Sequence, residues 1–385
     1  MRLHARMAIV LVALAGALLS GCGWALQGTP DPPARSLAGV SCPSSDACIA
    51  VGDSAQSGTD PLLAERWDGT SWEVLPSPET PADATASHLE AVSCTAPDAC
   101  IAVGSYDKDS AATPTVPLAQ RWDGDGWSVL DTPIPPDAPS GTMASYLSDV
   151  SCTSASACTA VGYYITSAGT FGLIERWNGS DWSIQPNPDD VDNNQLNGVS
   201  CTGDQECLAV GSAGDTGEAF SERWDGSAWQ VLLTPSPTGS TGSLLNDVSC
   251  VTASACTAVG ESVDGALVPQ ALAAYWNGGD WTIQDTPDPL GRRLVGVSCP
   301  AANTCTAVGE SNPTDDPQRA PLTLSERWNG SAWVVHPTPR PTDFPFSLFN
   351  DVSCATTATC EAVGEATFLR TPGSAALVAG FTLYP

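Results

Sequence analysis

The chain has 385 residues, of which 42% are hydrophobic, and its formal net charge is −29 at pH 7. Residues 1–21 contain two arginines and no carboxylate, so residues 22–385 carry 12 basic and 43 acidic side chains, a formal charge of −31. A chain this acidic repels nucleic acid and anionic lipid headgroups, so we expect no nucleic-acid partner. The 35 glycines and 32 prolines would suit a disordered chain, but thirteen tryptophans and regular apolar runs predict many short strands joined by turns.

The N-terminal segment has the pattern of an export signal. Arg2 and Arg6 precede an apolar run, Met7 to Ser20, which is shorter than the roughly 20 residues that span a bilayer. The run ends in Leu-Ser-Gly-Cys, which resembles the lipobox of bacterial lipoproteins, where cleavage precedes the cysteine and its thiol takes a diacylglycerol. We therefore expect a lipoprotein signal peptide over residues 1–21, lipidation of Cys22, and a place on the outer face of the bacterial cytoplasmic membrane. An ordinary signal peptide with a chance cysteine is the alternative.

One string recurs seven times after this segment: Val-Ser-Cys, five residues, Cys, one residue, Ala-Val-Gly. Fourteen cysteines fall into pairs, and the fifteenth is Cys22. Zinc sites use a shorter Cys-x2-Cys spacing, and only His88 and His336 follow the signal segment, so we expect disulfides rather than metal ligands. The expected disulfides are Cys42–Cys48, Cys94–Cys100, Cys152–Cys158, Cys201–Cys207, Cys250–Cys256, Cys299–Cys305 and Cys354–Cys360.

A second string follows each of the first six copies: Trp-Asp/Asn-Gly, two residues, Trp, preceded in most copies by Glu-Arg, as at residues 65–72. The Asp/Asn-Gly dipeptide predicts a tight hairpin turn. Each unit therefore predicts four short antiparallel strands, and a period near 50 residues is typical of one propeller blade. The tryptophan pairs could stack on sugars, but their recurrence in every unit favours a structural role.

The two ends of the chain complement each other. The seventh unit stops after its third predicted strand, at residues 377–381, whereas residues 23–32 look like a lone fourth strand. We expect residues 23–32 to form the outer strand of the closing blade, with Trp24 beside Phe381. The predicted fold is all-β: a single seven-bladed β-propeller of four-stranded antiparallel blades over residues 22–385.

The strings at residues 151–162 and 175–182 resemble those of uncharacterised secreted repeat proteins of high-GC Gram-positive bacteria. The likeness covers residues 24–385 and implies a propeller with no agreed activity. A looser likeness links the turns to kelch and sialidase-type Asp-box propellers. The sialidase Asp-box has one residue between Asp and Gly, whereas here the two are adjacent, so no glycosidase activity is carried over.

The connections between predicted strands differ at the two ends of each unit. At one end they are short and held by the disulfide or the Asp/Asn-Gly turn. At the other they vary in length and composition, which is typical of binding loops on a rigid scaffold. One variable loop carries Asp189, Asp190 and Asp192, which could hold Ca²⁺. The loop lacks the Gly and distal Glu of an EF-hand, so a solvated acidic loop is the alternative, and we expect no other cofactor.

These features favour a membrane-anchored extracellular binding or scaffolding module for a protein or a cell-envelope glycan, acting as a monomer and attached only by its lipid. The alternative is a glycosidase-like hydrolase or lyase with a site on the variable-loop face. No nucleophile motif appears, so no catalytic residue is assigned. Convergence of Asp189, Asp192, Tyr163, Tyr164 and Arg293 on one pocket would favour the enzyme, and scattering would favour binding. A structural role without a ligand is a third possibility.

Reduction of the disulfides should lower the melting temperature sharply. Each disulfide closes a small loop and stabilises the folded chain by roughly 2 kcal/mol in the chain-entropy model. Thermal denaturation followed by circular dichroism, with and without a reductant, measures the effect. An unchanged melting temperature in the reductant would contradict the expected role of the cysteines.

Overall fold

The computed structural model describes residues 23–29, 35–54, 62–76, 78–108, 115–135, 144–188, 193–265, 268–287, 292–311, 321–339, 346–367 and 374–382. These residues form 28 strands and no helix. Within these ranges there is accordingly no helix long and apolar enough to cross a membrane.

The strands follow the seven sequence repeats, four to each of the first six and three to the seventh, and pair antiparallel in chain order within each repeat. Repeats 2 and 3 join into one eight-stranded sheet through a single parallel bridge between Ala144 and Thr115. Repeat 1 holds β2 (Arg35–Ser44), β3 (Ala47–Ser54), β4 (Leu62–Trp67) and β5 (Trp72–Val74); repeat 2 holds β6 (Ala84–Ala96), β7 (Ala99–Lys108), β8 (Thr115–Trp122) and β9 (Trp127–Leu130); repeat 3 holds β10 (Ala144–Ser154), β11 (Ala157–Thr166), β12 (Gly169–Trp177) and β13 (Trp182–Ile184).

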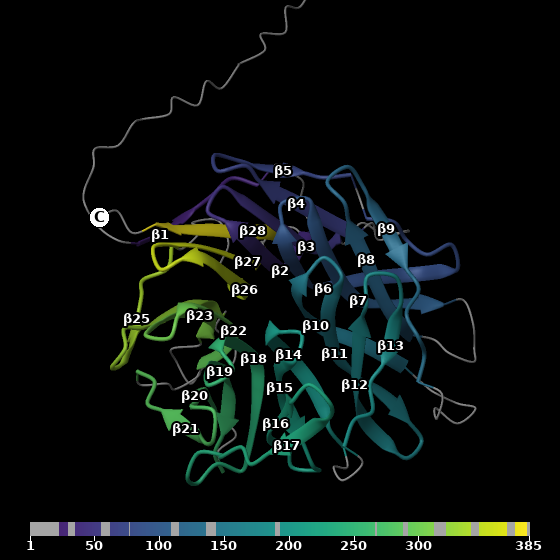
Figure 1. Ribbon diagram of the computed structural model, residues 1–385. Helices are drawn as coiled ribbons and strands as arrows, with labels where there is room; N and C mark the ends of the chain where they lie inside the picture. The colour runs from purple at the N-terminus through teal and green to yellow at the C-terminus, as the bar shows by residue number, and fades with distance from the viewer. Residues whose placement is uncertain are drawn as a thin grey trace, which may run out of the picture.

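The later repeats have the same order. Repeat 4 holds β14 (Gln195–Gly203), β15 (Glu206–Ala213), β16 (Glu218–Trp224) and β17 (Trp229–Leu232); repeat 5 holds β18 (Gly242–Thr252), β19 (Ala255–Val263), β20 (Pro269–Trp276) and β21 (Trp281–Gln284); repeat 6 holds β22 (Arg292–Ala301), β23 (Thr304–Ser311), β24 (Leu322–Trp328) and β25 (Trp333–Val335); repeat 7 holds β26 (Phe346–Thr356), β27 (Thr359–Thr367) and β28 (Ser374–Thr382). Figure 1 shows the repeats around a common centre, with the first strand of each innermost.

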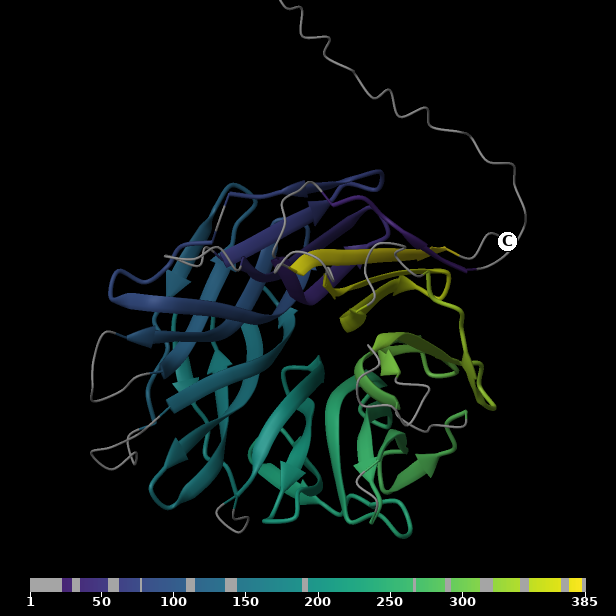
Figure 2. The same ribbon diagram turned by 180° about the vertical axis from the view of Figure 1, so that it is seen from behind.

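The fourth strand of the last sheet comes from the other end of the chain. Strand β1 (Gly23–Leu26) pairs antiparallel with β28, and Trp24 lies opposite Phe381 in the register. The Trp24 ring packs on Phe349, with 5.8 Å between centroids, while the side chain of Phe381 is outside the described part. The N-terminal strand therefore completes the sheet of repeat 7, and Figure 2 shows the first repeat beside the last.

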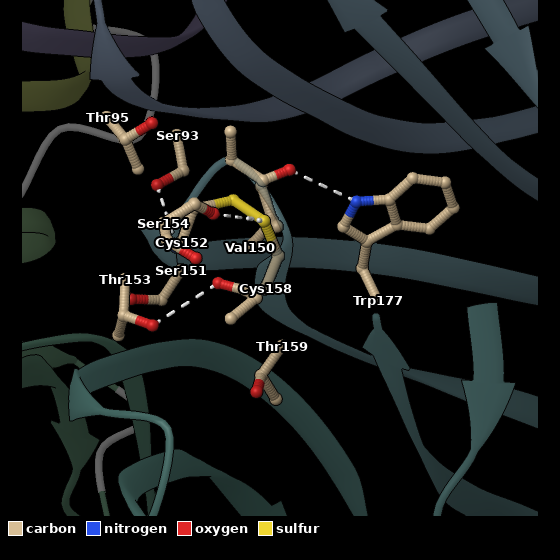
Figure 3. The surroundings of a disulfide bond; sticks show 12 residues. Ser93, Thr95, Val150, Ser151, Cys152, Thr153, Ser154, Cys158, Thr159 and Trp177 are labelled. Carbon is tan, nitrogen blue, oxygen red and sulfur yellow. Dashed lines mark hydrogen bonds between the residues drawn. A yellow bond between two sulfur atoms is a disulfide. The ribbon is translucent and has the colours of Figure 1, made fainter. Parts of the chain in front are cut away.

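The repeated strings fix one end of each sheet. In repeat 3, Cys152, Cys158, Trp177 and Trp182 form a row across the four strands. All seven expected disulfides are present, and the six tryptophan pairs pack with ring centroids 5.5 to 5.9 Å apart. The Trp177 indole N–H donates to the carbonyl of Ala155, in the turn that the disulfide closes (Figure 3). The cysteines and tryptophans therefore build the scaffold, as their recurrence predicts.

A serine hydroxyl links each inner strand to the next. In Figure 3 the Ser93 hydroxyl of repeat 2 accepts a hydrogen bond from the backbone N–H of Cys152 in repeat 3, at 3.0 Å. The same bond, at the same length, follows the serine of every Val-Ser-Cys string, and the last one joins Ser353 of repeat 7 to Cys42 of repeat 1. The serine of the string thus has an inter-repeat role that the sequence pattern did not reveal.

The third strand of several repeats buries a glutamate. Glu175 and Glu222 have no exposed surface, and neither carboxyl has a hydrogen-bond partner among the described residues. Burial raises the pKa of each to about 8. Glu326 is equally buried. Burial raises its pKa to about 7, and the nearby Arg292 guanidinium limits this rise because it favours the charged carboxylate. The neutral acid is therefore favoured at these positions.

The free energy of unfolding should fall as the pH rises, partly because of Glu175 and Glu222. Between the ordinary value of 4.5 and the raised pKa of about 8, each carboxyl holds a proton in the folded chain and releases it on unfolding. Each group therefore removes up to about 1.4 kcal/mol per pH unit as the pH rises through that window. Urea denaturation at several pH values measures the slope.

Glu222→Gln should reduce this slope. Glu218→Gln, at an exposed position on the same strand β16, is the matched control and should leave the slope unchanged. An equal slope in the wild type and Glu222→Gln would show that the Glu222 carboxyl is ionised in the folded chain.

Candidate functional site

The first strand of every repeat carries a β-bulge just before the Val-Ser-Cys string. The pairing with the second strand skips one residue at this point in all seven repeats. A bulge re-aims the side chain of the skipped residue. All seven skipped residues line one central cavity of about 440 Å³, and they are Ala38, Glu90, Ser148, Asn197, Asn246, Val295 and Asn350. The bulges therefore create the cavity wall.

The next residue of each inner strand alternates between aspartate and a small residue. In chain order these residues are Gly39, Ala91, Asp149, Gly198, Asp247, Gly296 and Asp351. We call this set the floor. Asp247 shows how its aspartates act: Oδ1 accepts from Val248 N–H of its own repeat at 2.6 Å, and Oδ2 accepts from Val297 N–H of the next repeat at 2.7 Å. Each floor aspartate makes both bonds, so it joins two repeats.

Close packing against the next repeat requires glycine at floor positions such as Gly198 and Gly296. A Cβ on Gly198 would lie 2.8 Å from the Cα of Asp247, and a Cβ on Gly296 would lie 3.0 Å from the Cα of Asp351. The alternation holds from Ala91 to Asp351 and fails once, where two small residues follow each other. The break falls at Gly39 and Ala91, so repeats 1 and 2 contribute no carboxylate to the floor.

The floor carboxyls take up protons more readily than ordinary aspartates. Burial raises the pKa of Asp247 to about 7 and that of Asp351 to about 8, and repulsion from Asp247 adds to the shift at Asp351. Burial and the charge of Asp247 also raise the pKa of Asp149. The backbone N–H bonds to each carboxyl oppose these effects but are weaker than burial. The charge of the cavity therefore changes near neutral pH.

Repeats 1 and 2 supply charged groups nearer the variable-loop end of the cavity. His88 Nδ1 lies 2.6 Å from Asp53 Oδ2, and Asp53 Oδ1 accepts from Leu89 N–H at 3.2 Å. Partial burial alone would lower the pKa of His88, but the hydrogen bond and charge of Asp53 outweigh it and raise the pKa. Burial also raises the pKa of Glu90, helped by the charge of Asp53. No sequence motif pointed to this pair, since its members lie 35 residues apart on different repeats.

The residue two positions before each bulge pairs with a residue of the second strand. These pairs lie at the end of the strands that bears the variable loops. We call these seven cross-strand pairs the rim. The seven rim pairs are of six kinds, with Leu–Glu found twice: Ser36–Asp53, His88–Ser105, Tyr146–Tyr163, Gln195–Ser212, Leu244–Glu261, Arg293–Glu310 and Leu348–Glu365. The floor therefore follows a regular pattern, whereas the rim above it differs from repeat to repeat.

The rim contains some of the residues singled out from the sequence. Tyr163 stacks on Tyr146, and Arg293 forms an ion pair with Glu310 at 3.3 Å. Tyr164 points to the other side of its strand, where it packs on Phe171 and on the hydrophobic cluster between repeats 2 and 3. None of these three singled-out residues lines the cavity. These three residues therefore do not converge on the cavity.

The candidate calcium ligands and the lipid site are outside these observations. Asp189, Asp190 and Asp192 lie outside the described residues, as does Cys22. Within the part of the chain that the structure describes, no group of three His, Cys, Asp or Glu side chains could hold a metal ion.

Neither the family models nor the curated proteins compared with the chain give a match. Solved structures do. YCF48 bound to a D1 peptide has a TM-score of 0.54 at 14% identity, over 94% of this chain and 96% of that one. YCF48 from Cyanidioschyzon merolae gives 0.52 at 11%, over 94% and 99%, and the WD40 β-propeller domain of Doa1 gives 0.54 at 11%, over 94% and 98%. The chain folds as a β-propeller. At these identities, the likeness establishes the propeller fold alone.

Gly198→Ala should destabilise the propeller. The added methyl would collide with the backbone of Asp247 and Asn246 in the next repeat, and such overpacking costs about 1–3 kcal/mol of unfolding free energy. Gly203→Ala is the matched control, because a Cβ there meets nothing within 4 Å, and it should change stability by less than about 0.5 kcal/mol. Urea denaturation of both variants measures the difference, and equal stabilities would contradict the close packing of the floor.

Proposed function

We propose that the chain is an extracellular, lipid-anchored propeller of seven blades that binds a protein or a cell-envelope glycan at the rim of its central cavity. The observation that carries this proposal is the contrast between a regular floor and a rim whose seven pairs are of six different kinds. A residue pattern repeated in every blade serves the fold. Side chains that vary over a rigid wall are typical of a binding surface.

Three contacts support a closed ring of seven blades. Ser353 and Asp351 of the last repeat accept hydrogen bonds from the backbone N–H groups of Cys42 and Val40 in the first, at 3.0 and 2.8 Å. Strand β1 pairs with β28 and covers the edge of the last sheet. Closure of this kind removes sheet edges that would otherwise recruit other chains.

The cavity chemistry supports a ligand that is neutral or positively charged. Five acidic residues line the cavity, namely Asp53, Glu90, Asp149, Asp247 and Asp351, and its described lining holds no Lys or Arg. A volume of about 440 Å³ falls in the range of small-ligand sites. YCF48 in one of the similar structures is bound to a peptide, which supports a peptide as one candidate ligand.

The register of β1 supports an outward-facing rim. Gly23 lies opposite Thr382, which in turn lies opposite Thr359 beside the turn closed by the last disulfide. A lipid on Cys22, one residue before Gly23, would hold the disulfide end of the propeller at the membrane. The rim lies at the opposite end of the strands and would face away from the membrane.

Glu90→Lys should abolish retention of the envelope ligand. The full chain, immobilised in detergent, is incubated with its own solubilised envelope fraction, and the retained protein and sugar are quantified. Reversing one charge inside the cavity should lower retention at least about tenfold, which corresponds to about 1.4 kcal/mol. The matched control is Glu206→Lys, at an exposed site on β15 beside the disulfide of repeat 4, which should retain the ligand. Equal loss in both variants, or no retention by the wild type, would contradict a ligand site at the rim.

A further inference from the structure

Repeat 3 has an aromatic rim pair, whereas none of the other six rim pairs contains an aromatic ring other than the His88 imidazole. Tyr146 on β10 lies opposite Tyr163 on β11, with ring centroids 5.0 Å apart and planes inclined by 32°. Both side chains are partly exposed. The pair presents aromatic surface beside the mouth of the cavity, where Ser148 of the same strand forms part of the wall.

The fold does not require these two rings. Among the described residues, neither tyrosine belongs to a buried hydrophobic cluster, and neither hydroxyl has a hydrogen-bond partner. The neighbouring Tyr164 differs, because it packs on the core between repeats 2 and 3. Repeats 1 and 4 place only polar side chains at the same rim positions, so an aromatic pair there is not a property of the blade.

A carboxylate of the neighbouring repeat lines the same cavity wall, because Glu90 and Ser148, two residues after Tyr146, are the bulge residues of repeats 2 and 3. Burial raises the pKa of Tyr163, and Tyr146 and Glu90 of the preceding repeat raise it further. Glu90 lines the cavity and is open to the solvent within it. The site therefore combines ring faces with a hydrogen-bond acceptor and a negative potential that repels anions.

We propose that Tyr146 and Tyr163 form a stacking platform for a pyranose ring of a neutral or amine-bearing glycan. This inference rests on the proposed ligand site at the rim and names its ligand class. The C–H face of a pyranose is weakly positive and packs on the negative face of an aromatic ring. Its hydroxyl groups donate to carboxylates such as Glu90. A glycan with uronate or phosphate groups is repelled by the acidic cavity.

The remainder of the lining favours a sugar over an apolar peptide side chain. Beside the platform, the wall consists mainly of carboxylates, amides and hydroxyls, for example Glu90, Ser148 and Asn197. An apolar side chain placed there would bury polar groups without partners, which is unfavourable. A polyol provides partners for them.

The test uses the full chain in a detergent without a sugar headgroup. It is applied to an array of neutral, amine-bearing and acidic oligosaccharides, and the strongest partner is then titrated by calorimetry. We expect neutral or amine-bearing glycans to bind and acidic ones not to bind. Tyr146→Ala and Tyr163→Ala should each weaken binding at least about tenfold, which is the scale of one lost aromatic contact. Tyr146→Phe and Tyr163→Phe keep the rings and should bind within about threefold of the wild type.

Tyr275→Ala, at the disulfide end of β20, is the matched control for the loss of a partly buried tyrosine and should bind as the wild type does. Thermal denaturation of each variant shows that it is folded. Absence of binding across the array, binding that survives both alanine variants, or a preference for acidic glycans would overturn the proposal. Retention of an envelope protein that depends on Glu90 but not on the tyrosines would overturn the glycan platform and leave the rim site standing.

Discussion

Neighbouring repeats of this propeller share almost no sheet hydrogen bonding in the described residues, so contacts between their first strands must align them. The bond from each serine of Val-Ser-Cys to the backbone N–H of the next repeat's first cysteine does this seven times at 3.0 Å. A neutral hydrogen bond contributes only about 0.5–1.5 kcal/mol, but it sets the height of one strand against the next. The donor residue is itself held by the disulfide, so the covalent bond also fixes the geometry of the contact between repeats.

Aligned inner strands have a consequence for the cavity. Because the bulges lie at one height, their seven side chains meet in one wall, and the floor residues below them must fit together in turn. Gly198 leaves room for the backbone of Asp247, which bridges two repeats. The alternation fails at Gly39 and Ala91, two small residues in succession. Repeats 1 and 2 contribute no carboxylate to the floor, but their Asp53 and Glu90 line the cavity nearer the rim. The cavity is therefore asymmetric although the scaffold is repetitive.

Much of the scaffold could be predicted from the sequence, because the cysteine and tryptophan pairs are local hairpin features separated by five or six residues. The role of β1 also followed from the sequence, since repeat 7 lacked the one strand that residues after Cys22 could supply. The site could not be predicted in the same way. Whether Asp53 meets His88, or Tyr163 meets Tyr146, depends on strand register and on a bulge that no residue type marks. The serine and the floor aspartates were visible in the repeat, but their partners lie in the next repeat and become apparent only in three dimensions.

Under the proposed function, stability and recognition are separated along the strands. The disulfide end carries a disulfide in each repeat, whereas the rim chemistry varies among the repeats. Between them lie carboxyls whose pKa values burial moves close to neutrality, about 7 for Asp247 and about 8 for Asp351. A cationic ligand near the floor would favour their ionised forms and release protons on binding, whereas a neutral ligand would leave them protonated. The floor can therefore accept either kind of ligand without burying an uncompensated charge, and the choice between ligands falls to the rim.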